Sequence, residues 1–122
     1  MLKQHDPRYP LVIAVDFDNT IAKTDYPRII SEIPGAIASL IAMQKAGYIV
    51  ILNTCRIDRY LADAVEWLAN RGFTADYVNE NEPKRIKRFG GDCRKISADY
   101  YIDDKNHAIK PINWKSISRE VL

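Results

Sequence analysis

Cysteine is scarce in this chain, which contains only Cys55 and Cys93, and their spacing matches no metal-binding motif. We therefore expect reduced thiols and a cytoplasmic location. No apolar run approaches the roughly 20 residues that span a bilayer. The first eight residues also contain no apolar stretch of the signal-peptide type. These absences predict a protein that neither crosses a membrane nor enters the secretory route.

Charge of one sign is not in excess either. The chain has 18 Lys and Arg against 16 Asp and Glu, and its formal net charge is +2. A charge this small does not by itself indicate nucleic-acid binding. The sequence also lacks internal repeats, low-complexity tracts and linkers, and its 122 residues are enough for one hydrophobic core. We expect a single domain over residues 1–122.

Short apolar runs alternate with segments of helical character along the chain. Strands are expected at residues 11–16, 48–52, 75–78 and 100–102. Helices are expected from Pro34 to Gly47, from an N-cap at Asp58 to Gly72, over 83–89 and over 113–122, and a loop or flap over 17–33. Strands that alternate with helices predict an α/β fold, in which a parallel sheet is covered by helices on both faces.

The most informative feature is a set of polar groups that follow these strands. Asp16 and Asp18 lie at the end of the first strand, Thr54 follows the second, and Asp103 follows the last, with Asp104 beside it. Ligands of parallel α/β sheets bind at the carboxyl ends of the strands. Carboxylates held close together repel and need a cation or a proton. Two acidic pairs at one sheet edge therefore indicate a magnesium site suited to phosphoryl chemistry.

These motifs resemble those of the haloacid dehalogenase (HAD) superfamily, a group of aspartate-nucleophile phosphatases and phosphotransferases. Its Asp-x-Asp-x-Thr motif matches residues 16–20, its Thr or Ser after the next strand matches Thr54, and its final acidic pair matches residues 103–104. Its lysine motif is best matched by Lys95. The order and spacing agree over residues 11–104, which is most of the chain.

Two positions complicate the match. Asn19 stands where many members carry glycine, although asparagine tolerates unusual backbone angles better than most residues. Lys84 and Lys87 compete with Lys95 for the lysine motif, and Lys95 has the shorter lead into the last strand.

The resemblance implies a three-layer Rossmann-like (HAD-like) fold with helices on both faces of a parallel sheet. Many members carry a separate cap domain, inserted after the first motif or between the second and third. Here residues 20–34 leave room only for a short flap, and residues 58–95 are occupied by a helix, a strand and a turn. We therefore expect no cap domain and an open site that admits bulky phosphorylated substrates.

The resemblance also implies roles for the individual residues. Asp16 would be the nucleophile that forms an aspartyl-phosphate. Asp18 would protonate the leaving oxygen and then deprotonate water, with a pKa raised by Asp16 and Asp103. Mg²⁺ would bind a carboxylate oxygen of Asp16, the backbone carbonyl of Asp18 and the pair at 103–104. The phosphoryl oxygens would be contacted by Thr54 and Lys95.

Further substrate contacts are expected at Asn19, Thr20 and Arg56, although Arg56 pairs equally well with an acid. In the flap, Tyr26 and Arg28 are additional candidates. The substrate would be a phosphorylated small molecule or macromolecular end. A homo-oligomer in which a neighbouring subunit supplies the lid remains open.

The leading function is that of a Mg²⁺-dependent phosphomonoester hydrolase, and alternatives remain. The basic run at residues 84–89, followed by Arg94 and Lys95, would suit a polynucleotide-end phosphatase. Glu80 and Glu82 weaken that reading, and a solvated helix face is the more common explanation. A phosphate-binding or regulatory module without turnover ranks last, because both aspartates of the first motif are present. A receiver domain is disfavoured because its acidic pair comes at the first strand.

Overall fold

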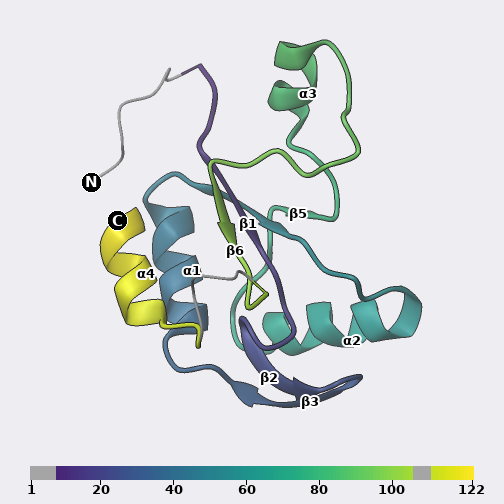
Figure 1. The fold of residues 1–122 in the computed structure, drawn as a ribbon, viewed down its shortest axis with the longest axis vertical. Helices are drawn as coiled ribbons and strands as arrows, with labels where there is room; N and C mark the ends of the chain where they lie inside the picture. The colour runs from purple at the N-terminus through teal and green to yellow at the C-terminus, as the bar shows by residue number, and fades with distance from the viewer. Residues whose placement is uncertain (1–7, 106–110) are drawn as a thin grey trace.

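The computed structural model describes residues 8–105 and 111–122 and has a mixed α/β fold (Figure 1). Its strands are β1 (Val12–Val15), β2 (Ala22–Asp25), β3 (Arg28–Glu32), β4 (Ile49–Leu52), β5 (Tyr77–Val78) and β6 (Tyr100–Ile102). Its helices are α1 (Ala36–Lys45), α2 (Asp58–Ala69), α3 (Pro83–Phe89) and α4 (Trp114–Val121). Among these helices, none has the length and apolar content needed to cross a membrane.

A parallel sheet of four strands organises the fold, in the order β5-β4-β1-β6. The register pairs Val15 of β1 with Leu52 of β4 and with Ile102 of β6. All four residues of β1 are buried, as expected for a central strand in a covered parallel sheet. The expected parallel sheet is therefore confirmed, and the ends of β1, β4 and β6 meet at one edge.

The segment expected as a loop or flap contains a second, two-stranded sheet. Strands β2 and β3 pair antiparallel and form a hairpin that lies beside α2 (Figure 1). Most side chains of these two strands are exposed or half-buried, so their sequences do not alternate between apolar and polar residues. Their base is fixed instead by Ile21 and Ala22, which are fully buried. A pattern that depends on one apolar face could not reveal these strands.

Two details of the helices differ from expectation. Helix α1 begins after Gly35, which has the positive φ of 84°, rather than at Pro34. Helix α2 begins at Asp58, which has φ 50°, and Ile57 occupies the cap position without a side-chain hydrogen bond. The prediction of Asp58 as the N-cap was therefore wrong.

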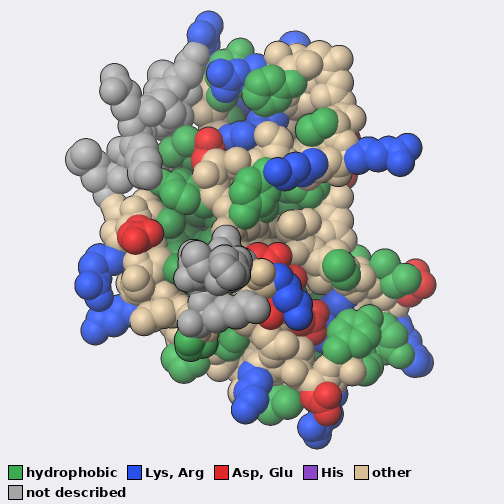
Figure 2. All heavy atoms as spheres, in the orientation of Figure 1, with side chains coloured by type: hydrophobic (Ala, Val, Ile, Leu, Met, Phe, Trp, Pro, Cys, Tyr) green, Lys and Arg blue, Asp and Glu red, His purple; other side chains and the backbone are tan. Residues whose placement is uncertain are grey.

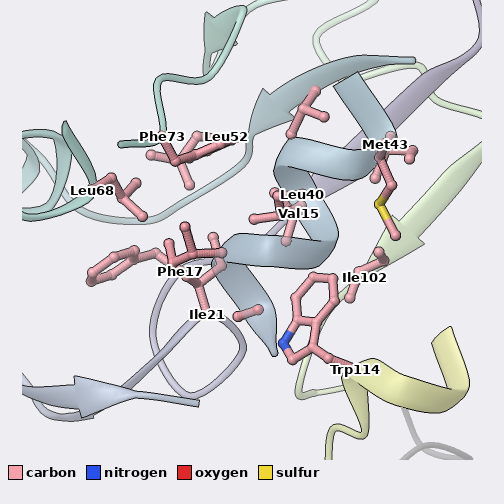
Figure 3. Packing of buried hydrophobic residues seen from close by; sticks show 14 of the residues in the cluster. Val15, Phe17, Ile21, Leu40, Met43, Leu52, Leu68, Phe73, Ile102 and Trp114 are labelled. Atoms are coloured by element: carbon pink, nitrogen blue, oxygen red, sulfur yellow. The ribbon is translucent and has the colours of Figure 1, made fainter. Parts of the chain in front are cut away.

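One hydrophobic cluster joins the sheet to the helices (Figure 3). Helices α1 and α4 lie side by side (Figure 1), and Trp114 at the start of α4 is buried in the cluster. Phe17 is also fully buried, although it lies between Asp16 and Asp18. Because Phe17 is anchored in the core, the segment that carries the two aspartates is held firmly at the end of β1.

Candidate functional site

Three half-buried carboxylates converge at the carboxyl edge of the sheet. Asp16 follows β1, and its N–H donates to the carbonyl of Ile102 at 2.9 Å, which places it beside the end of β6. Asp103 and Asp104 follow β6 directly. One carboxylate oxygen from each of the three aspartates lies within 4.8 Å of the others. The sequence prediction that these groups meet at one edge is confirmed.

The side-chain hydroxyl of Thr20 connects two of these aspartates through hydrogen bonds. Its hydroxyl donates to Oδ2 of Asp16 at 3.2 Å and accepts a hydrogen bond from the N–H of Asp104 at 2.9 Å. The indole of Trp114 donates to the carbonyl of Thr20 at 2.7 Å. Thr20 is fully buried. The prediction that it contacts substrate was therefore wrong, because its hydroxyl is used to position two aspartates.

The electrostatics of the group favour a cation. Burial, the charge of Asp103 and a hydrogen bond with Asp104 together raise the pKa of Asp16 from 3.8 to about 7, against the opposing hydrogen bonds from Phe17 and Thr20. Removing water from carboxylates that face one another makes their charge costly. A divalent cation with oxygen ligands would offset that cost, and Mg²⁺ prefers carboxylate oxygens and water. The residues present therefore fit a magnesium ion.

Asp18 is engaged elsewhere, since its carboxylate is held by Arg56. Nε and Nη2 of Arg56 donate to Oδ2 and Oδ1 of Asp18 at 2.9 and 2.7 Å, and the hydroxyl of Thr24 donates to Oδ1 at 2.8 Å. The guanidinium also donates to the carbonyls of Pro27 at 3.0 Å and Tyr60 at 3.2 Å. Arg56 thus joins the first motif to the hairpin and to α2.

The pairing with Arg56 lowers the pKa of Asp18, which the sequence analysis expected to be raised. Burial would raise the pKa of Asp18, but hydrogen bonds from Arg56 and Thr24 and the charge of Arg56 hold it below its usual value. The prediction of a raised pKa at Asp18 was wrong, because the crowding acts on Asp16 instead. Of the two expectations for Arg56, the structure shows the pairing with an acid, here Asp18, and not the substrate contact. The Arg56 side chain is fully buried, with the guanidinium 5.0 and 5.1 Å from the ring centres of Phe17 and Tyr26.

Thr54 lies at the edge of the sheet that the sequence predicts, and Asn19 has the unusual backbone that the sequence allows for. Thr54 follows β4 at the same edge as Asp16, since the N–H of Asn53 donates to the carbonyl of Val15 at 2.8 Å. The Thr54 hydroxyl accepts from the N–H of Arg56 at 3.1 Å, which leaves its proton available for another acceptor. Asn19 has φ 57°, so the expected tolerance of a left-handed backbone is used.

The structure does not bring Lys95 to the acidic group, contrary to prediction. The Lys95 ammonium lies 5.1 Å from the ring centre of Tyr101, and its carbonyl accepts from Asn81. Lys84 and Lys87 lie on α3, which Figure 1 places at the opposite end of the molecule from the β2–β3 hairpin. Spacing along the chain could not reveal that residues 83–95 turn away from the site.

A cation that the sequence analysis missed lies closer to the site. Lys23 of β2 lines an open hollow of about 600 Å³ together with Asn19, Asp104, Ile33 and residues 111–112. Lys23 is exposed, and within the described residues no carboxylate lies at ion-pair distance from it. The sequence offered one signal for Lys23, which is its position three residues after Thr20 in the first motif. The β2–β3 hairpin is what brings Lys23 beside Asp104.

A comparison with solved structures finds a strong similarity to a bacterial protein. The chain superposes with a TM-score of 0.81 on the structure of a conserved protein coded by a locus from Bacteroides thetaiotaomicron, with 36% sequence identity. The match covers 93% of this chain and 90% of that one. No protein-family model and no curated protein matches the chain. The name of the Bacteroides protein states no activity, so the comparison shows a shared α/β fold and a shared family but indicates no function.

Proposed function

The chain belongs to the same family as the conserved Bacteroides thetaiotaomicron protein, and we propose that it is a Mg²⁺-dependent phosphomonoester hydrolase. The observation that carries the proposal is the convergence of Asp16, Asp103 and Asp104, whose carboxylate oxygens lie within 4.8 Å of one another. The resemblance of residues 16–20 to the HAD first motif supports it independently. We further propose the three-layer, capless form of that fold and a cytoplasmic location.

Mg²⁺ would be held by Asp16, Asp103 and Asp104, with the backbone carbonyl of Asp18 as a further ligand. Bound there, it would neutralise charge on the phosphoryl oxygens. Asp16 would attack phosphorus, and the bond from phosphorus to the leaving oxygen would break. Water would then attack the aspartyl-phosphate, so that the phosphorus–oxygen bond to Asp16 breaks and inorganic phosphate leaves. The hydroxyl of Thr54 would donate to a phosphoryl oxygen.

The role of Asp18 depends on Arg56. While Arg56 donates to both carboxylate oxygens, Asp18 is ionised and cannot protonate a leaving group. Acid catalysis by Asp18 therefore requires its carboxylate to separate from Arg56, which also contacts Pro27 of the hairpin. We propose that movement of the hairpin accompanies the chemical step.

This same pairing favours one alternative, a phosphate-binding or regulatory module without turnover. Such a module would keep the acidic group and the Mg²⁺ but would hold Asp18 permanently on Arg56. The polynucleotide-end phosphatase is less favoured, because α3 and its basic residues lie at the end of the molecule away from the hairpin (Figure 1).

The test is a panel of phosphomonoesters that includes sugar phosphates, nucleotides, aryl phosphates and phosphorylated DNA ends, each with Mg²⁺ and with EDTA. We expect Mg²⁺-dependent phosphate release from at least one, abolished in Asp16→Asn. Matched control variants are Asp25→Asn and Asp63→Asn, which change exposed acids outside the acidic group. Mg²⁺ and phosphate binding without turnover of any substrate would favour the non-catalytic module. Turnover that persists in Asp16→Asn would refute the assignment.

A further inference from the structure

Helix α3 adds almost nothing to the hydrophobic core. None of its seven residues is buried, and Phe89 at its end is 64% exposed. Most helices in proteins persist because one face packs on a core. Here the ends are fixed instead, since the Glu82 side chain accepts from the N–H of Arg85 at 3.0 Å and Gly90 adopts a left-handed cap. The fold therefore maintains a short helix most of whose side chains face solvent.

The side chains of α3 and the loop after it carry a concentrated positive charge. Arg85 forms an internal ion pair with Asp99 and also donates to Ser97 at 3.0 Å. The other five basic side chains are exposed, and within the described part of the chain none has a carboxylate at ion-pair distance; they are Lys84, Lys87, Arg88, Arg94 and Lys95. We call these five the basic surface.

Aromatic rings lie among these cations. The Arg88 guanidinium lies 4.4 Å from the ring centre of Tyr9 and 5.4 Å from that of Phe89. The Lys95 ammonium lies 5.1 Å from the ring centre of Tyr101, which is 43% exposed. Figure 2 shows blue and green side chains gathered together at the end of the molecule where Figure 1 places α3. Cations and exposed rings therefore share one surface.

We propose that the basic surface, with Phe89 and Tyr101, binds single-stranded nucleic acid without sequence preference. The lysines and arginines would contact phosphates, and the exposed rings would stack on bases, which is the combination that single-strand binding proteins use. An acidic polypeptide would need the charge but not the exposed rings. An anionic membrane surface would favour a continuous apolar face on the helix, whereas α3 has cations on most of its positions.

This proposal does not depend on the proposed hydrolase activity. Helix α3, which carries three of the five residues of the basic surface, lies at the opposite end of the molecule from the hairpin that borders the acidic group (Figure 1). A bound strand would therefore leave the Asp16 site accessible. Nucleic-acid binding and phosphate release can be lost separately.

The test is fluorescence anisotropy with labelled 20-nucleotide oligo(dT) and oligo(rU) at several salt concentrations. We expect binding that weakens steeply with salt, and at least tenfold weaker binding by Lys84→Glu/Lys87→Glu/Arg88→Glu. The slope of log K against log salt should fall by about 2, since each phosphate contact to a single strand contributes about 0.7. The matched control is Lys45→Glu/Lys115→Glu/Arg119→Glu, which makes the same charge change at exposed positions of α1 and α4.

A second variant separates stacking from charge. Phe89→Ala should weaken oligonucleotide binding about tenfold, because stacking on one ring contributes about 1–3 kcal/mol per base, while heparin binding should stay unchanged. Circular dichroism would check that Phe89→Ala remains folded. Any of the following would overturn the proposal: no oligonucleotide binding at low salt, equal losses in the control triple variant, an unchanged affinity in Phe89→Ala, or binding to phosphatidylserine vesicles but not to oligonucleotides.

Discussion

Arg56 donates hydrogen bonds to both carboxylate oxygens of Asp18, at 2.9 Å from Nε to Oδ2 and at 2.7 Å from Nη2 to Oδ1. The Arg56 side chain is fully buried, and that of Asp18 is 23% exposed. The same guanidinium contacts Pro27 of the hairpin and Tyr60 of α2. One ion pair therefore links the first motif, the hairpin and α2, and it also determines the protonation of the expected acid–base residue.

Replacing Arg56 by Ala should lower the free energy of unfolding by about 3 kcal/mol, because removing one partner leaves the other carboxylate partly buried without its counter-charge. Urea unfolding would measure the loss, with Arg59→Ala as the control at an exposed arginine of the same helix region. In a double-mutant cycle with Asp18→Asn we expect a coupling of at least about 1 kcal/mol. Additive effects of the two substitutions would contradict the ion pair.

The Asp16 carboxylate should make the metal-free protein less stable as pH rises. Its pKa is about 7 in the folded protein against 3.8 in the unfolded chain, so the folded state holds the extra proton between these values. Stability from this group is therefore full at low pH and is lost as pH rises toward 7. Thermal unfolding in EDTA should show a higher Tm for Asp16→Asn than for wild type at pH 8. Equal pH profiles for the two proteins would show that Asp16 titrates normally.

Mg²⁺ should stabilise the wild-type protein, and more strongly at pH 8 than at pH 6, because it competes with the proton on Asp16. At a concentration 100 times its Kd the ion should add about 2.7 kcal/mol to the free energy of unfolding. Thermal shift titrations would measure this effect. Asp103→Asn should abolish most of it, whereas Asp25→Asn, which changes an exposed acid of the hairpin, should retain it. An undiminished shift in Asp103→Asn would place the ion elsewhere.

The sequence alone predicted the parallel sheet and the proximity of the aspartates in the acidic group. It did not predict the positions of Arg56 and Lys95, which depend on contacts between segments far apart in the chain. Asp16 and Asp103 each follow an apolar strand, and parallel strands end at one edge, so their proximity could be predicted. Arg56 lies in a connection with no regular pattern, and its burial depends on rings contributed by Phe17 and Tyr26. Lys95 was placed by spacing alone, which carries no information on the direction of a loop.

We predict that Lys23, rather than Lys95, donates a charged hydrogen bond to the phosphate of the substrate. It lines the hollow beside Asp104, whereas Lys95 lies on the ring of Tyr101. Losing one charged hydrogen bond to substrate costs at least about 1.5 kcal/mol, so Lys23→Ala should raise KM about tenfold for an active phosphomonoester. Steady-state kinetics of Lys23→Ala and Lys95→Ala would compare the two positions directly. A larger effect at Lys95 would restore the original assignment.

Thr20→Val should loosen the acidic group without changing its charge. Valine has nearly the shape of threonine but leaves the N–H of Asp104 without its acceptor and Oδ2 of Asp16 without its donor. We expect a loss of about 1–3 kcal/mol in the free energy of unfolding, since an unsatisfied buried group costs that much. Mg²⁺ affinity should also fall, because Asp16 and Asp104 are no longer held at one separation, and Thr20→Ser should recover most of both losses. If Thr20→Val kept wild-type Mg²⁺ affinity in thermal shift titrations, Thr20 would act only in folding and would not position the two aspartates.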